Sequence, residues 1–132
     1  MNHILIVEDE DFLVRALKDN LESEGLSVSS TAEGESALTE IKRKRPDLVL
    51  LDLLMPKRDG FYVLEEMKKN IDWKLIPIIV VSNLGGEDDI KKALEMGADD
   101  YFIKSQHPIE EVIERVKEYL SGARSVKPNK KD

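Results

Sequence analysis

The sequence contains no cysteine and only two histidines among its 132 residues. The lack of cysteine excludes disulfides, thiolate nucleophiles, zinc–thiolate sites and iron–sulfur clusters. His3 and His107 are far apart in the sequence and have no metal-ligand spacing, so we expect both to be surface residues. A metal site built from this chain would therefore use oxygen ligands, which select Mg²⁺, Mn²⁺ or Ca²⁺ over zinc.

Long apolar runs are also missing. No stretch approaches the roughly 18–20 apolar residues that a membrane-spanning helix needs. The N-terminus leads directly into Ile4-Leu5-Ile6-Val7, without the basic start and small-residue cleavage site of a signal peptide. The formal net charge of −7 disfavours non-specific binding to nucleic acid and to anionic membranes. We therefore expect a cytoplasmic protein that binds neither nucleic acid nor membrane directly.

The chain is long enough for one domain with a real hydrophobic core. Short apolar runs predict five strands, which are Ile4–Val7, Ser27–Thr31, Leu48–Leu51, Ile76–Val81 and Tyr101–Ile103. Between and after them, apolar residues at helical spacing predict helices around 13–21, 37–41, 62–67, 90–94 and 109–120. Repeated strand–helix units favour an α/β fold with a single five-stranded parallel sheet and helices on both faces. The second and fifth strands are more polar, which suits positions near the sheet edges.

The end of the chain differs in composition from the rest. Residues 122–132 have no apolar period and carry several lysines, whereas residues 1–121 hold all the predicted strands and helices. We interpret 1–121 as the domain and 122–132 as a disordered basic tail or the start of a linker. Both a stand-alone protein and one part of a longer protein remain open.

Polar residues follow four of the predicted strands. Glu8-Asp9-Glu10-Asp11 follows the first strand, Asp52 the third, Ser82-Asn83 the fourth and Lys104 the fifth. Because parallel α/β sheets bind ligands at the carboxyl ends of their strands, we expect these residues to meet on one rim. Neighbouring carboxylates repel unless a cation is present, and an open all-oxygen site favours Mg²⁺. The lysine and the hydroxyl indicate a phosphoryl group as the remaining ligand.

These residues resemble the receiver domain of bacterial two-component response regulators. The resemblance covers about residues 3–120 and rests on a set of motifs in the expected order. They are Glu8-Asp9, Asp52 within Leu48-Val49-Leu50-Leu51-Asp52-Leu53-Leu54-Met55-Pro56, Asp59-Gly60, Ser82, and Asp100-Tyr101-Phe102-Ile103-Lys104. The resemblance implies a flavodoxin-like fold with strand order 2-1-3-4-5.

The resemblance also implies a role for each site residue. Asp52 is the expected phosphoacceptor, which takes a phosphoryl group from a phosphohistidine. Lys104 would pair with the phosphoryl oxygens, and Ser82 would hydrogen-bond one of them. Glu8, Asp9, Asp52 and the backbone carbonyl of Leu54 would hold Mg²⁺. On this interpretation the protein is a signalling switch and not an enzyme. It would catalyse only its own phosphorylation and autodephosphorylation.

Ser82 and Tyr101 are the expected switch residues, because in the family the aromatic side chain reorients when the hydroxyl moves. The implied output is a conformational change of the face formed by the fourth helix, the fifth strand and the fifth helix. The implied partner is a sensor histidine kinase or phosphotransfer protein. The same face forms homodimers in some relatives, and Asp100, Arg115 and Lys91 are candidates for salt bridges between subunits.

Other residues near the motifs have simpler interpretations. We expect Glu10 to be a solvated acid or a helix cap, Asp11 to be the N-cap of the first helix, and Asp59-Gly60 to form the turn into the third helix. Ser105 follows Lys104, where the family commonly has proline. Two further positions, Leu54 and Leu84, flank the path of the hydrolytic water in receivers.

Three other functions can be weighed against the switch. A pseudo-receiver, acting only as a constitutive interaction module, is disfavoured by the intact Asp9, Asp52, Ser82 and Lys104. A phosphatase of the haloacid dehalogenase type needs a second aspartate two residues after the nucleophile, where this chain has Leu54. A flavodoxin-like electron carrier needs a Ser/Thr-rich phosphate loop after the first strand, where this chain has acids that would repel the phosphate.

Overall fold

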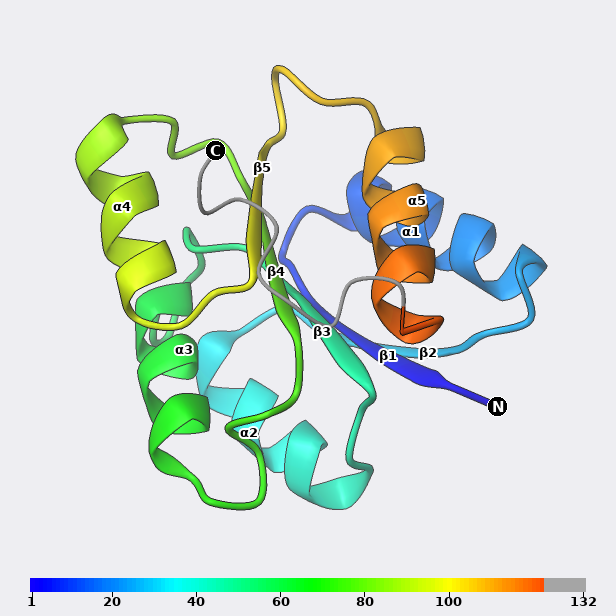
Figure 1. Ribbon diagram of the computed structural model, residues 1–132, viewed down its shortest axis with the longest axis horizontal. Coiled ribbons are helices and arrows are strands. Elements are labelled where there is room, and N and C mark those ends of the chain that lie inside the picture. The colour runs from blue at the N-terminus through cyan, green and yellow to red at the C-terminus, as the bar shows by residue number, and fades with distance from the viewer. Residues whose placement is uncertain (123–132) are drawn as a thin grey trace.

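The computed structural model describes residues 1–122, in which five strands and five helices alternate (Figure 1). The strands are β1 (His3–Val7), β2 (Ser27–Thr31), β3 (Leu48–Leu51), β4 (Ile78–Ser82) and β5 (Asp100–Ile103). The helices are α1 (Asp11–Ser23), α2 (Gly34–Arg43), α3 (Gly60–Lys69), α4 (Glu87–Glu95) and α5 (Ile109–Leu120). The predicted tail, 122–132, lies outside the described residues except for Gly122.

All neighbouring strands are parallel, and the sheet order is β2-β1-β3-β4-β5. This confirms the predicted α/β class, the strand order and the edge positions of β2 and β5. Of the predicted strands, the fourth needs the largest correction, because it begins at Ile78 instead of Ile76. Pro77 has no amide hydrogen to donate to a neighbouring strand, so regular pairing starts after it.

The sheet separates two hydrophobic cores. Along β1, Ile4 and Ile6 pack with residues of α1 and α5, whereas Leu5 and Val7 pack with residues of α2, α3 and α4. This alternation follows from the two-residue period of a strand. Figure 1 shows the same division, with α1 and α5 on one side of the sheet and the other three helices opposite. Because both faces are covered, the central strands are almost wholly apolar.

Backbone pairing continues for one residue beyond several strands. The amide of Glu8 donates to the carbonyl of Thr31 (2.9 Å), and that of Asp52 donates to Val7 (2.9 Å). The amide of Lys104 donates to the Ser82 carbonyl, also at 2.9 Å. These bonds fix the main chain of the first residue after β1, β3 and β5. The polar side chains that follow the strands therefore start from one edge of the sheet.

The start of α3 packs closely against the end of β3. A side-chain carbon on Gly60 would lie 2.2 Å from the carbonyl oxygen of Asp52, so only glycine fits there. The Asp59 side chain accepts a hydrogen bond from the Tyr62 amide at 3.0 Å and caps the helix. Asp59 and Gly60 thus lead into the third helix as expected, but as its N-cap and first residue and not as a separate turn.

Two predictions about polar residues are wrong. His3 is buried, because its ring nitrogens pair with the hydroxyls of Ser27 and Ser29 at 2.8 and 2.9 Å. The N-cap of α1 is Glu10 and not Asp11, which is already the first helical residue. Helix α1 therefore begins one residue earlier than the sequence pattern indicated.

Within residues 1–122, none of the helices is both long and apolar enough to cross a membrane. The same residues contain no cis peptide bond, so the bond between Lys104 and Ser105 is trans.

Candidate functional site

Acidic residues that follow β1 and β3 meet around the ammonium group of Lys104, which follows β5. Its Nζ lies 3.0 Å from Glu8 Oε2 and 3.2 Å from Asp52 Oδ2. Glu8 and Asp52 are buried, and the Lys104 side chain is 14 % exposed. The site therefore joins residues from the ends of β1, β3 and β5, as the sequence predicted.

Asp9 joins the two buried acids on the same rim. Carboxylate oxygens of Glu8, Asp9 and Asp52 all lie within 4.8 Å of one another, and Asp9 is exposed to solvent. Three carboxylates this close repel one another unless positive charge is nearby. The set consists of oxygen donors only, which suits a hard divalent cation.

The electrostatics of the site are dominated by burial and by this crowding. Burial, together with the charge of Asp52, raises the pKa of Glu8 to about 7. Burial alone would lower the pKa of Lys104, but its hydrogen bonds to Glu8 and Glu10 and the charge of Asp52 outweigh burial and raise that pKa. Lys104 is thus firmly cationic, whereas Glu8 holds its proton more tightly than an ordinary glutamate does.

Leu54 lies beside the predicted phosphoacceptor. Its amide donates to Asp52 Oδ1 at 3.1 Å, so the two oxygens of Asp52 have different partners. The Leu54 residue is 51 % exposed, which leaves an apolar side chain at the rim.

Ser82 and Tyr101 are both tied to Leu84 in the loop between β4 and α4. The Leu84 amide donates to Ser82 Oγ at 3.3 Å, and its carbonyl accepts from the Tyr101 hydroxyl at 2.5 Å. Ser82 is fully buried, and burial together with the Asp89 and Asp52 charges raises the pKa of Tyr101 to about 12. A movement of this loop therefore changes a hydrogen bond of each residue.

Two contacts of the site and its surroundings were not predicted. Glu10 occupies the N-cap position of α1, one of its two expected roles, but its side chain is also an ion-pair partner of Lys104, with Oε1 at 3.0 Å from Nζ. Asp100 and Arg115 form a salt bridge within the same chain. Local sequence gives little signal for either pair, because the partners are far apart along the chain and meet only after folding.

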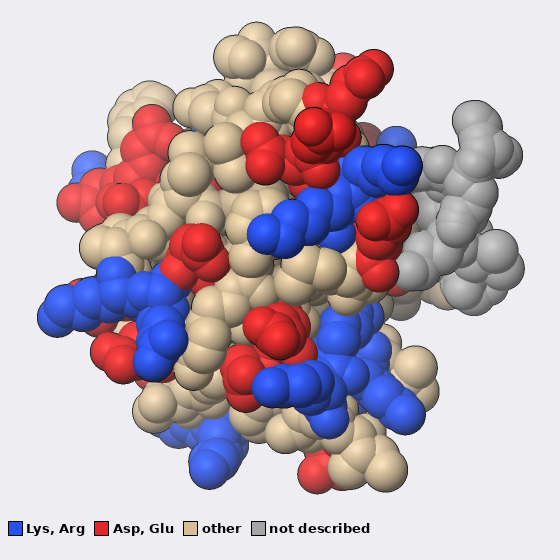
Figure 2. Space-filling view, turned by 90° about the vertical axis from the view of Figure 1, so that its left-hand side faces the viewer, with Lys and Arg blue, Asp and Glu red and all other residues tan. Residues whose placement is uncertain are grey.

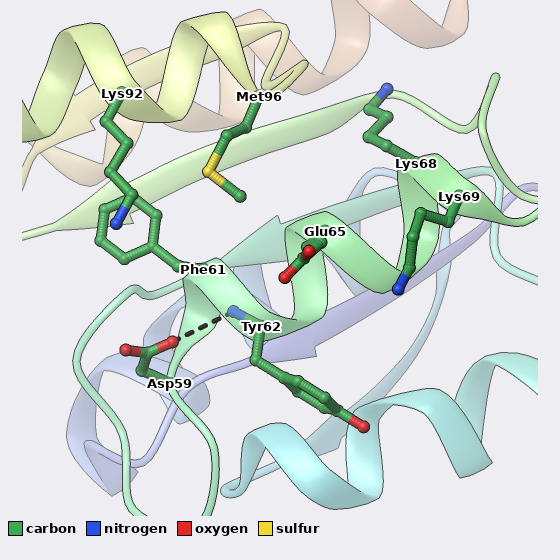
Figure 3. Close-up of a pocket in the computed structure, with 8 residues that line it drawn as sticks. All are labelled: Asp59, Phe61, Tyr62, Glu65, Lys68, Lys69, Lys92 and Met96. Carbon is green, nitrogen blue, oxygen red and sulfur yellow. Dashed lines mark hydrogen bonds between the residues drawn. The ribbon is translucent and has the colours of Figure 1, made fainter.

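A separate hollow of about 570 Å³ lies between α3 and α4. Figure 3 shows Phe61 and Met96 in it, with the Lys92 ammonium over the Phe61 ring, 4.2 Å from its centre. None of the predicted site residues is among the residues that line this hollow. Acidic and basic side chains are interspersed on this side of the molecule (Figure 2), so no patch of one charge dominates it.

Comparison with known proteins decides the family. The family model of the response regulator receiver domain matches residues 4–117. The chain belongs to the response regulator receiver domains. It is 44 % identical over 107 residues to the probable transcriptional regulator ycf27 of Porphyridium aerugineum, a match that covers 81 % of this chain and 43 % of that protein. The chain thus spans about half the length of the curated relatives it matches.

Solved receivers have the same fold. The receiver domain of a signal transduction histidine kinase from Syntrophus aciditrophicus is 33 % identical, with a TM-score of 0.85 and coverage of 97 % of this chain and 96 % of that one. The phosphorylated cyanobacterial phytochrome response regulator RcpA is 28 % identical, with a TM-score of 0.83 and coverage of 97 % and 99 %. The receiver resemblance inferred from the motifs is confirmed.

The raised pKa of Glu8 predicts how stability depends on pH without divalent metal. The folded state holds this proton more tightly than the unfolded chain, so the free energy of unfolding should fall as pH rises from about 4.5 through about 7. Glu8→Gln cannot ionise and should lose less stability over that interval. Urea unfolding at several pH values in EDTA measures the difference. The exposed Glu22→Gln on α1 is the control and should follow the wild type; equal slopes for Glu8→Gln and wild type would contradict the assignment.

Proposed function

We propose that this domain is a phosphoryl-accepting signalling switch with Asp52 as the phosphoacceptor. The observation that carries the proposal is the Asp52 carboxylate at the end of β3, with Oδ2 facing the Lys104 ammonium at 3.2 Å. Glu8 and Asp9 complete an acidic cluster beside it. One solved receiver of the same fold is itself a phosphorylated response regulator, which supports the same chemistry here.

The reaction requires an anion to approach another anion. An Asp52 oxygen forms a bond to phosphorus, and the bond between phosphorus and a histidine nitrogen of the donor breaks, with its electron pair leaving on that nitrogen. Lys104 lowers the repulsion and pairs with the negative charge of the phosphoryl oxygens. The buried hydroxyl of Ser82 is the second expected donor to the phosphoryl group. The donor is a sensor histidine kinase or a phosphotransfer protein.

The acidic cluster fits Mg²⁺. Three carboxylates with oxygens within 4.8 Å form an all-oxygen donor set, and Lys104 alone cannot balance their charge. Glu8, Asp9, Asp52 and the carbonyl of Leu54 are the residues that would hold the ion. When bound, it would supply positive charge that favours phosphoryl transfer.

Phosphorylation would be read out through the loop between β4 and α4. Ser82 and Tyr101 both bond to Leu84, so drawing the Ser82 hydroxyl toward a phosphoryl group would disturb the hydrogen bond of Tyr101. The surface that changes is then the α4–β5–α5 face. This coupling links the chemistry at Asp52 to a protein surface.

The same face is the proposed surface for a homodimer. Of the three candidate residues, Asp100 and Arg115 already pair within one chain, so salt bridges between subunits would have to share or replace that pair. Lys91, on α4, carries no such competing salt bridge in the described residues.

The alternative function, a constitutive interaction module, is not favoured. Such a module would not need Lys104 and the acidic residues to lie together at one site.

Asp52→Asn should abolish phosphorylation. Acetyl phosphate with Mg²⁺ should add one phosphoryl group to the wild type, and intact-mass spectrometry measures it. EDTA should prevent the gain. Asp72→Asn, in the connection before β4, is the matched control and should be phosphorylated normally. A full mass gain by Asp52→Asn would overturn the assignment.

Asp9→Ala should remove most of the Mg²⁺ affinity without unfolding the domain. For the wild type, metal at 100 times its Kd would add about 2.7 kcal/mol to stability, and this gain should be largely lost in the variant. Without metal the variant should be as stable as the wild type or more so, because one repelling carboxylate is gone. Thermal unfolding with and without Mg²⁺ measures both effects, with the exposed Asp19→Ala as control. A large loss of metal-free stability in Asp9→Ala would contradict the prediction.

The phosphorylated state should be long-lived for a receiver, because Leu54 and Leu84 cannot orient the hydrolytic water. Leu54→Asn and Leu84→Glu, singly and together, should speed decay several-fold, a barrier change of about 1 kcal/mol. The decay of the phosphorylated mass with time measures this. If all three variants decay at the wild-type rate or more slowly, these leucines are packing residues only.

A further inference from the structure

The Lys104 ammonium has three carboxylate partners, and one of them, Glu10, has no role in the receiver motifs. Glu8 Oε2 and Glu10 Oε1 each lie 3.0 Å from Nζ, and Asp52 Oδ2 lies at 3.2 Å. An ammonium group has three N–H donors. All three therefore have a carboxylate acceptor, and none is left for an incoming phosphoryl oxygen.

The three partners differ in how easily they can leave. Glu8 and Asp52 are buried, so an unpaired charge at either position would be costly. The Glu10 side chain is 57 % exposed, so water can replace Lys104 as its partner. The main chain of Glu10 is held independently, because its amide donates to Glu8 Oε2 at 3.1 Å and its carbonyl accepts from Val14 at 3.0 Å. Its side chain can therefore swing away while α1 stays in place.

We propose that Glu10 is a displaceable partner of Lys104, which occupies the lysine in the unphosphorylated state and must release it for Asp52 to be phosphorylated. This positioning role rests on the proposed function of Asp52. Glu10 opposes phosphoryl transfer in two ways. It uses one N–H donor of Lys104, and its own negative charge repels the phosphoryl donor.

The size of the effect follows from the exposure of the pair. Solvent-exposed ion pairs are worth about 0.2–1 kcal/mol, so releasing Lys104 in advance should speed phosphorylation by up to about fivefold. Glu10→Gln keeps the length and shape of the side chain but removes its charge. It should accept phosphate from acetyl phosphate about two- to fivefold faster than the wild type, at saturating Mg²⁺.

The matched control is Asp11→Asn. Asp11 carries the same charge one residue further on, and no salt bridge joins it to Lys104 in the described part of the chain. This variant has the same net charge as Glu10→Gln but leaves the contact intact. It should be phosphorylated at the wild-type rate.

A second readout separates the contact from a structural effect on α1. Beryllofluoride mimics a phosphoryl group on a carboxylate. It should bind Glu10→Gln with a Kd lower than that of the wild type by about the same factor. Without ligand, Glu10→Gln and the wild type should have similar thermal stability. Equal rates and equal beryllofluoride affinity for Glu10→Gln and wild type would overturn this inference but leave the phosphoacceptor role of Asp52 standing. Equal acceleration by Asp11→Asn would also overturn it, because bulk charge would then explain the effect. Failure of the wild type to gain any phosphate would overturn both proposals.

Discussion

The ion pairs of Lys104 are the interaction on which the organisation of this site depends. Lys104 follows the edge strand β5, whereas Glu8 and Asp52 follow the interior strands β1 and β3. The lysine thus spans three strands and compensates buried negative charge that would otherwise strongly destabilise the folded state. Without it, two buried carboxylates would face each other beside two further acids, Asp9 and Glu10.

The acidic residues crowded around Lys104 also bear on how this site could accept a negatively charged phosphoryl group. The pKa of Glu8 is raised chiefly by burial and next by the charge of Asp52, and the nearby Lys104 offsets only part of this. A divalent cation would stabilise such a site, because its charge would lower both the repulsion among the carboxylates and their repulsion of the phosphoryl group. Glu10 adds a solvent-exposed ion pair with Lys104, so the resting site has more acidic groups than cations, and one of its ion pairs can open to water.

In the proposed switch, transmission away from the site would depend on hydrogen bonds to a single loop residue, Leu84. The Leu84 amide donates to Ser82 Oγ, and the Leu84 carbonyl accepts a hydrogen bond from the Tyr101 hydroxyl. While both bonds hold, they restrain both side chains. Tyr101 belongs to β5, whose neighbour Asp100 pairs with Arg115 of α5. A change at Ser82 in the proposed switch would therefore meet residues of β5 and α5 that are adjacent in space, which is the contact that a two-state element requires.

The sequence alone determined the strand and helix order, because buried parallel strands need continuous apolar runs and each helix needs an apolar stripe. It also determined which residues lie at the strand ends, since Asp52 and Lys104 directly follow those runs. The tertiary structure decided everything that depends on partners distant in the chain. His3 is buried because β2 brings two serine hydroxyls to its ring. Glu10 is an ion-pair partner because β5 delivers Lys104 to it, 94 residues away in the sequence. Local patterns report burial and periodicity, but the partner of a charge is fixed only when the sheet assembles.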